Sequence, residues 1–275
     1  MISRVVPIAD PHSGLRVGLM PPKVIEAKGT QFQRTLTQGT TQKMLWKKWT
    51  AAHDRIFDGT ADEVIVIFTG DMVHGIKDAT GIYTSSYKTQ KDAIVQCVLP
   101  WVNKASMSYC VRGTRWHVGD DGIVEDQIAQ ELGCYKHHSF HKLEIEIQGV
   151  RFMVAHKGPK PGSRAWLKKN SMLLAFNDRY FSALQLGTEP SDVYLWGHFH
   201  EYVSGYLEVE GPWGSKIISG YVLPAWCTPN EYALENVGNL EIADVGMIYF
   251  DIEDGYLTKH DLFTRYDAVE RVKYG

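Results

Sequence analysis

The chain has 275 residues, of which 44% are hydrophobic and 22% are charged, a composition typical of a globular protein with one sizeable core. Its formal net charge of -3 excludes a global positive field that would draw the protein onto nucleic acid, so any such contact has to be local. No apolar run approaches the ~20 residues of a membrane-spanning helix, and the apolar stretch at the N-terminus stops after six residues, too short for a signal peptide. The four cysteines form no CxxC pair, which is typical of reduced thiols. We therefore expect a cytoplasmic protein without a membrane partner.

Short β-branched or aromatic runs alternate with helix-like stretches along much of the chain. The runs predict buried strands at residues 4–9, 63–69, 107–112, 151–155 and 192–196. The stretches predict helices at residues 43–57, 87–104, 123–132 and 165–186. This alternation indicates a layered α/β fold.

Four later segments are more typical of strands joined in hairpins. They are residues 141–147, 217–219, 246–252 and 256–263. A two-sheet sandwich flanked by helices accommodates both kinds of segment, and this is the fold that we predict. Because we find no internal repeat, low-complexity tract or linker, we interpret residues 1–275 as a single domain.

Polar side chains follow the first five predicted strands at the point where each strand ends. They are Asp10 and His12, then Asp71, then the segment Gly113-Thr114-Arg115-Trp116-His117, then His156, and finally His198 with His200. In open α/β sheets, ligands bind outside the carboxyl ends of the strands, so we expect these clusters to converge on one rim. A single histidine at a strand end is more often structural than functional, so the prediction depends on the combination.

Two carboxylates and four imidazoles, most of them beside glycine, match what a pair of divalent transition-metal ions needs. Mixed oxygen and nitrogen donors suit Mn, Fe, Zn or Ni, whereas an all-oxygen set would suit Mg or Ca. We expect two divalent ions, with Mn²⁺ preferred and Fe, Zn or Ni as alternatives. A carboxylate such as Asp71 can bridge two ions about 3.5–4 Å apart, a spacing that suits in-line displacement at phosphorus.

The order of the motifs resembles the calcineurin-like metallophosphoesterase superfamily. This order is D-x-H, G-D, a Gly-led third motif, a lone His and G-H-x-H, and it spans residues 10 to 200. The resemblance implies a four-layer fold, a double β-sandwich with helices on its outer faces. It also implies a nucleophilic metal-bound hydroxide and a set of metal ligands. In this set Asp10, His12 and His200 hold one ion, His156 and His198 hold the other, and Asp71 bridges the two.

The third motif departs from the family's usual pattern, which is G-N-H followed by an acid. Thr114 stands at the position of the Asn that binds the second metal ion, and Arg115 at the position of the His next to the leaving group. A hydroxyl is a poor metal ligand, and a guanidinium cannot donate a proton at neutral pH. His117 could take either role, as ligand or general acid, so we take His117 and Arg115 as the candidate catalytic residues. The G-T-x-x-H variant resembles virus-encoded members of the superfamily, which favours a phage origin.

A cationic run follows His156 and contains the candidate substrate-binding residues Lys157 and Arg164. The run also includes Lys160, Lys168 and Lys169. A charge run is usually a solvated surface, but this one begins one residue after a predicted metal ligand and therefore has to start at the site.

Three residues elsewhere could also contact a substrate. His74 lies three residues past Asp71 and could touch a substrate phosphate. Trp226 and Tyr83 could each stack on a base, although the core is the commoner place for an aromatic side chain.

The leading hypothesis is a phosphodiesterase that depends on two metal ions and acts on nucleotides or nucleic acid. The nearest alternative is a phosphomonoesterase that acts on a nucleotide or a small-molecule phosphate. A protein Ser/Thr phosphatase is disfavoured because its pattern retains G-N-H-E. From a different class, the chain could be a degenerate metal-binding module without turnover, which only the altered third motif favours.

Overall fold

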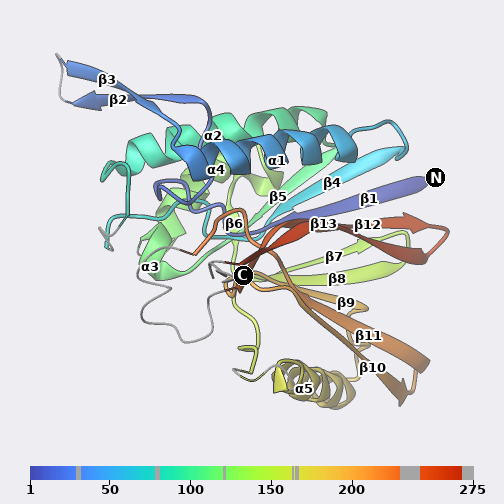
Figure 1. Cartoon of the computed structure of the whole chain (residues 1–275). Helices are drawn as coiled ribbons and strands as arrows, with labels where there is room; N and C mark the ends of the chain where they lie inside the picture. The colour runs from blue at the N-terminus through green and yellow to red at the C-terminus, as the bar shows by residue number, and fades with distance from the viewer. Residues whose placement is uncertain are drawn as a thin grey trace, which may run out of the picture.

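The computed structural model describes residues 1–28, 32–77, 81–119, 122–162, 164, 167–229 and 242–267. Within these residues two β-sheets lie against each other, and helices cover both outer sides (Figure 1). The layers run from helices to the first sheet, then to the second sheet and to one further helix. The predicted α/β double sandwich with four layers is therefore confirmed.

The first sheet has six strands in the order β13-β12-β1-β4-β5-β6. Its parallel strands are β1 (Ile2–Ile8), β4 (Glu63–Phe68), β5 (Met107–Val111) and β6 (Ser139–Phe140). The long hairpin of β12 (Ile242–Glu253) and β13 (Tyr256–Asp267) adds two antiparallel strands beside β1. β1 and β4 are buried almost throughout because layers cover both faces of the sheet, which explains the apolar runs at residues 5–8 and 64–68.

The second sheet has five strands in the order β10-β11-β9-β8-β7. They are β7 (Leu143–Ile147), β8 (Val150–Ala155), β9 (Val193–Trp196), β10 (Val203–Gly211) and β11 (Gly214–Val222). β8 pairs in parallel with β9, and β9 with β11, whereas β7 and β10 close the sheet as antiparallel edges. A separate two-stranded sheet, β2 (Lys23–Lys28) and β3 (Phe32–Thr37), extends away from the sandwich (Figure 1).

Helices cover the outer face of each sheet. α1 (Thr40–Ile56), α2 (Tyr87–Lys104) and α4 (Ile123–Leu132) lie over the first sheet, and α5 (Asn170–Leu186) lies over the second (Figure 1). The short helix α3 (Arg115–Val118) and the 3₁₀ turn η2 (Tyr135–His137) occupy connections.

Three apolar cores separate the four layers, and β1 shows how alternation produces two of them. The side chain of Val6 packs into the core with α1 and α2, while that of Val5 packs into the core between the two sheets. Neighbouring residues of a strand point to opposite faces, so one buried strand supplies both cores. The third core lies between the second sheet and α5 and contains Phe176 and Trp196.

The predicted helices at 87–104 and 123–132 match α2 and α4, and the predicted strands differ from the observed ones mainly at their ends. The predicted start of the fourth helix was too early, because α5 begins at Asn170, and residues 165 and 166 lie outside the described part of the chain. The segment 217–219 proves to be the middle of a longer strand, β11, which begins with the small or polar residues 214–216 and ends at the buried Val222.

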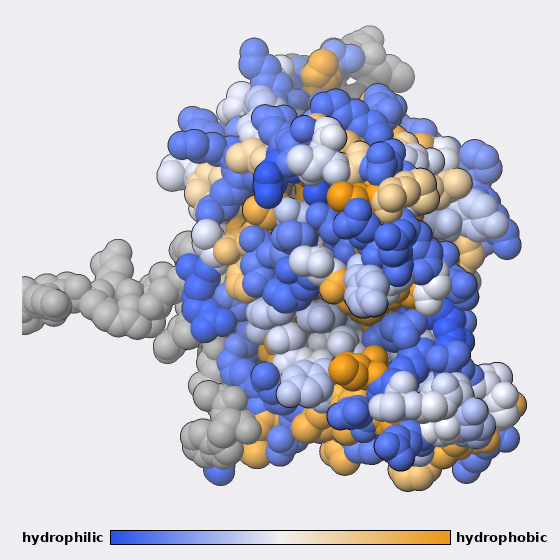
Figure 2. Space-filling view, turned by 90° about the vertical axis from the view of Figure 1, so that its right-hand side faces the viewer, coloured by the Kyte–Doolittle hydropathy of each residue, from blue (hydrophilic) through white to orange (hydrophobic). Residues whose placement is uncertain are grey.

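Figure 2 shows the end of the molecule that is opposite the carboxyl ends of β1 and β4. Its surface is mainly hydrophilic, with hydrophobic residues scattered among the hydrophilic ones. Among the helices that the structure describes, we find none that is both long and apolar enough to cross a bilayer.

Candidate metal centre

All six predicted metal ligands lie in loops that leave the carboxyl ends of strands. β1 and β4 are parallel neighbours in the first sheet, and β8 and β9 are parallel neighbours in the second. Asp10 and His12 follow β1, Asp71 follows β4, His156 follows β8, and His198 and His200 follow β9. The structure brings these side chains together where the two sheets meet, as the interatomic distances show.

One group of donors consists of Asp10, His12 and His200. The Nε2 atoms of His12 and His200 lie 3.1 Å apart, and they lie 3.7 and 3.5 Å from Oδ1 of Asp10. Asp10 is fully buried, and its Oδ1 atom has no hydrogen-bond partner among the described residues. A buried carboxylate oxygen without a donor is costly unless a cation accompanies it, so this group fits a metal ion.

A second group consists of Asp71, His156 and His198, whose donor atoms all lie within 4.8 Å of one another. Oδ2 of Asp71 lies 3.0 Å from Nε2 of His156. Asp71 also forms a group within the same distance with Asp10 and His12. Asp71 therefore shares one group with Asp10 and His12 and another with His156 and His198, which is what a bridging ligand would need.

The backbone at the site is strained. Five of the six candidate ligands adopt positive φ, with values of 52° for Asp10, 42° for His12, 50° for Asp71, 77° for His198 and 55° for His200. A residue with a side chain pays about 1–3 kcal/mol for such a conformation, and strain of this kind clusters at functional sites.

Glycines beside the ligands are required by close packing. A Cβ atom on Gly113 would lie 2.2 Å from Oδ1 of Asp71, and one on Gly197 would lie 2.7 Å from Oδ2 of Asp10. Any side chain at these positions would displace a candidate ligand. Gly113 of the third motif and Gly197 of the fifth therefore leave the space that the two carboxylates occupy.

Hydrogen bonds fix the orientation of several ligands. Nδ1 of His156 donates to the carbonyl of Thr69 over 2.7 Å, which leaves its Nε2 atom facing the centre. The backbone N–H of His198 donates to Oδ2 of Asp10, and the N–H of Thr114 donates to Oδ1 of Asp71. The Thr114 hydroxyl also lies 3.1 Å from both oxygens of Asp71. Thr114 thus holds the candidate bridging carboxylate, a role that second-layer groups often have in metal sites.

The local electrostatics favour a cation. Burial and the neighbouring His117 and His200 hold the pKa of His12 well below its ordinary value, and burial and His156 lower that of His198 to about 4. Both imidazoles are therefore neutral at pH 7, as a metal ligand must be. Burial lowers the pKa of His156, but Asp71 and Asp10 outweigh it and raise that pKa to about 10. The carboxylates therefore create a negative potential that draws positive charge to this point.

His117 lies beside this centre on α3. Its Nδ1 atom donates to the backbone carbonyl of His74 over 2.6 Å, and its Nε2 atom lies 3.8 Å from Oδ2 of Asp71. The ring centroid of His117 lies 4.6 Å from that of His12 and 4.9 Å from that of His74. The Nε2 atom, which does not bond to the His74 carbonyl, therefore faces the candidate ligands.

The other four predicted site residues differ in exposure. His74 is 4% exposed and lies behind His117, which its carbonyl orients. Arg115, on the first turn of α3, and Lys157, next to His156, are both exposed at the rim. Arg164 is also exposed.

The far end of the cationic run returns to the site. Lys168 forms an ion pair with Glu201, which directly follows His200. The run therefore starts next to one candidate ligand, His156, and Lys168 near its end pairs with the neighbour of another, His200.

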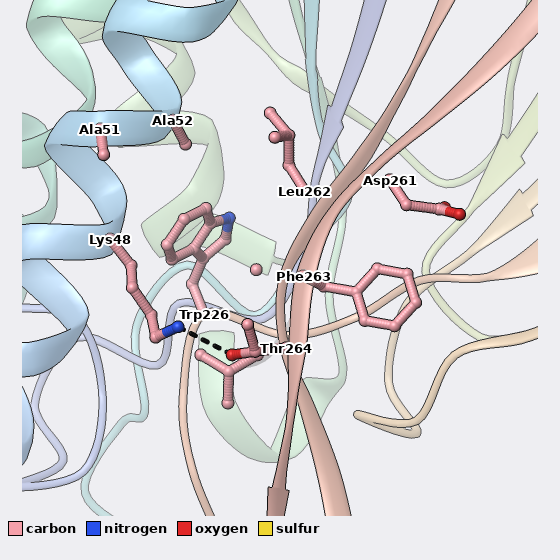
Figure 3. Close-up of a pocket in the computed structure, with 10 residues that line it drawn as sticks. Lys48, Ala51, Ala52, Trp226, Asp261, Leu262, Phe263 and Thr264 are labelled. Atoms are coloured by element: carbon pink, nitrogen blue, oxygen red, sulfur yellow. Dashed lines mark hydrogen bonds between the residues drawn. The ribbon is translucent and has the colours of Figure 1, made fainter.

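The two aromatic residues considered for base stacking differ in exposure. Trp226 is 1% exposed and is enclosed between α1 and β13, near Lys48 and Leu262 (Figure 3). The hydroxyl of Tyr83 lies 3.2 Å from that of Ser13, and burial raises its pKa. Trp226 therefore belongs to the interior, whereas Tyr83 is half-buried beside the small apolar cluster of Met20, Val24 and Ala93.

Two residues that the sequence reasoning missed support the site. Glu125 on α4 is fully buried and accepts hydrogen bonds from the backbone N–H groups of Gly113 and Met72, at 2.5 and 3.2 Å. It thereby joins the loop that carries Asp71 to the third motif. The sequence feature that could have indicated Glu125 is a charged residue on the buried face of an amphipathic helix. The Sγ atom of Cys227 lies 3.3 Å from Nδ1 of His200, a contact that no local sequence pattern predicts.

No protein-family model matches the chain, and no characterised protein matches it by sequence. Solved structures with a similar chain path include Vps29 from Entamoeba histolytica complexed with zinc, at 13% identity over 97% of this chain and 99% of that chain, with a TM-score of 0.43. They also include YfcE, a phosphoesterase from E. coli, at 14% identity over 97% and 100%, with a TM-score of 0.41. A conserved predicted phosphoesterase from Streptococcus pneumoniae shows 11% identity over 97% and 98%, with a TM-score of 0.38. Similarities this distant leave the family and the activity to be argued from the site.

Proposed function

We propose that this chain is a phosphodiesterase that uses two divalent metal ions to hydrolyse phosphodiester bonds of nucleotides or nucleic acid. The observation that carries the proposal is the position of Asp71 in two neighbouring groups of metal-ligand donors, one of which includes Asp10 and His12, and the other His156 and His198. Both sheets contribute donors, which also favours a single domain over residues 1–275.

In this proposal Asp10, His12 and His200 hold one ion, His156 and His198 hold the second, and Asp71 is shared. The nitrogen-rich donor set suits Mn²⁺, with Fe, Zn or Ni as alternatives. When bound, such a pair of ions supplies an activated water and neutralises charge on the phosphate under attack.

The residues of this chain then bind the substrate and move the proton. Nδ1 of His117 is held by the His74 carbonyl, so Nε2 can donate a proton to the leaving oxygen or bind an ion. Arg115, exposed beside His117, provides positive charge near the leaving group. Lys157 and Arg164 belong to the cationic run that begins next to His156, and in this proposal they hold a second phosphate of the substrate.

The test is a metal analysis combined with turnover of two chromogenic substrates, bis(4-nitrophenyl) phosphate and 4-nitrophenyl phosphate. We expect about two equivalents of metal and preference for the diester. Preference for the monoester would make the protein a phosphatase. Bound metal without turnover of either substrate would identify a degenerate metal-binding module.

A further inference from the structure

Trp116 is the exposed tryptophan of the described residues. Its side chain is 55% exposed, and it belongs to none of the apolar cores, whereas Trp49, Trp101 and Trp226 lie in the core beneath the helices. An indole in water forgoes the large stabilisation that burial of an aromatic ring provides. Packing therefore does not account for Trp116.

The position of Trp116 is tied to the candidate metal centre. It stands between Thr114, whose N–H donates to Asp71 over 2.7 Å, and His117, whose Nδ1 donates to the His74 carbonyl. The loop packs closely here, because a Cβ atom on Gly75 would lie 2.5 Å from the carbonyl oxygen of His117. These contacts hold the backbone of α3 and place the indole at the edge of the site.

A cation accompanies the ring. Nζ of Lys77 lies 5.7 Å from the centroid of the Trp116 ring, and the Lys77 side chain is itself exposed. Lys77 belongs to the loop that follows Asp71, so the pair joins the second and third motifs on the surface. An exposed aromatic ring with a neighbouring ammonium group is the combination with which proteins hold single-stranded nucleic acid, by stacking on a base and attracting a phosphate.

We propose that Trp116 and Lys77 form a subsite for an unpaired nucleobase and its phosphate next to the bond that is cleaved, so that the substrate is single-stranded nucleic acid. This inference rests on the proposed phosphodiesterase function. A paired base has both faces covered by its neighbours in the helix, so only an unpaired base offers a face to Trp116. A protein with a net charge of -3 has little general attraction for nucleic acid, which makes a local stacking contact more important.

The test measures binding, separately from turnover, of a fluorescent single-stranded oligonucleotide and of an abasic strand with the same number of phosphates. Fluorescence anisotropy of the metal-loaded protein gives the Kd of each. We expect Trp116→Ala to raise the Kd of the base-containing strand about 5- to 100-fold and to leave that of the abasic strand within about twofold. Trp116→Phe should restore most of the affinity, because its ring can still stack.

Tyr256→Ala is the matched control, since Tyr256 is a 79% exposed aromatic residue at the start of β13, and it should change neither Kd. Equal weakening for both strands, no weakening, or equally tight binding of a blunt duplex would overturn the proposal. Turnover of bis(4-nitrophenyl) phosphate, measured on the same samples, tests the phosphodiesterase function independently. If the parent protein does not turn over this substrate but Trp116→Ala selectively loses base binding, the phosphodiesterase function is refuted and the base-binding site is retained.

Discussion

Oδ2 of Asp71 lies 3.0 Å from Nε2 of His156, although the two residues follow strands of different sheets. Asp71 follows the β4 strand of the first sheet, and His156 follows the β8 strand of the second. The contact therefore joins the two halves of the sandwich at its carboxyl end. Burial opposes ionisation of Asp71, but His156 and His117 outweigh it and hold the pKa of this carboxyl below its ordinary value. A carboxylate that stays ionised at this junction can act together with the ligand atoms of both sheets.

Replacement of Asp71 by Asn should abolish turnover and release at least one metal ion. The amide keeps the shape of the side chain but removes the charge that two cations would share. Metal content per chain and the rate with bis(4-nitrophenyl) phosphate are the two measurements. Asp54→Asn, at an exposed position of α1, is the control and should retain both metal and activity. Retention of both ions with a near-normal rate would remove Asp71 from the bridging role.

The candidate ligands could be predicted from sequence because each stands directly after a short apolar run. These buried parallel strands end in apolar residues, so the first polar residue beyond them marks the end of the strand, as Asp10 does after β1 and His198 does after β9. The rule that ligands gather at the carboxyl ends of strands then places them on one rim. Local patterns thus sufficed to predict that these side chains gather at one rim, whereas their role as metal ligands stays a prediction.

Other features depend on contacts between residues that are distant in the chain. Nothing near Glu125 in the sequence reveals that it accepts N–H groups from Gly113 and Met72. β10 was missed because its residues alternate between exposed and half-buried positions and include Gly205, against which α5 packs. Trp116 was passed over in favour of Trp226, since exposure cannot be judged without knowing which elements cover a loop.

The His117→Ala variant should separate the two roles left open for this residue. Loss of one equivalent of metal would identify His117 as a ligand. Retention of both ions with a fall in kcat of about 10²–10⁴ would identify it as a general acid, and the basic limb of the pH profile should then disappear. His138→Ala, near Phe140 on the neighbouring strand, provides a control histidine that should not change the rate. An unchanged His117→Ala enzyme would show that the residue is structural.

The cationic run should govern affinity for substrates with more than one phosphate. We expect Arg164→Ala, or Lys157→Ala combined with Lys160→Ala, to raise KM for an oligonucleotide about tenfold or more, because each change removes a charged hydrogen-bond donor. Turnover of bis(4-nitrophenyl) phosphate, which has no second phosphate, should change little. Lys47→Ala, on the exposed side of α1, controls for total charge. Equal losses on both substrates would mean that the run supports the metal site, and no loss on either would make it a solvated surface.

Glu125 should make the stability of the metal-free protein depend on pH. Burial and the nearby Asp71 raise the pKa of Glu125 from 4.5 to about 8. Between these values the unfolded chain has lost the proton that the folded protein retains, so the free energy of unfolding falls as the pH rises from about 4.5 to about 8. Gln mimics the protonated acid and still offers an oxygen to the N–H of Gly113 or Met72.

Glu125→Gln should therefore match the parent protein near pH 5 and exceed its stability near pH 9. Urea unfolding in the presence of a chelator, repeated across this range, gives the two curves. Glu146→Gln, at an exposed position of β7, is the matched control and should follow the parent at every pH. If the Glu125→Gln protein is less stable than the parent by the same amount at pH 5 and pH 9, the carboxyl of Glu125 is not protonated in the folded protein.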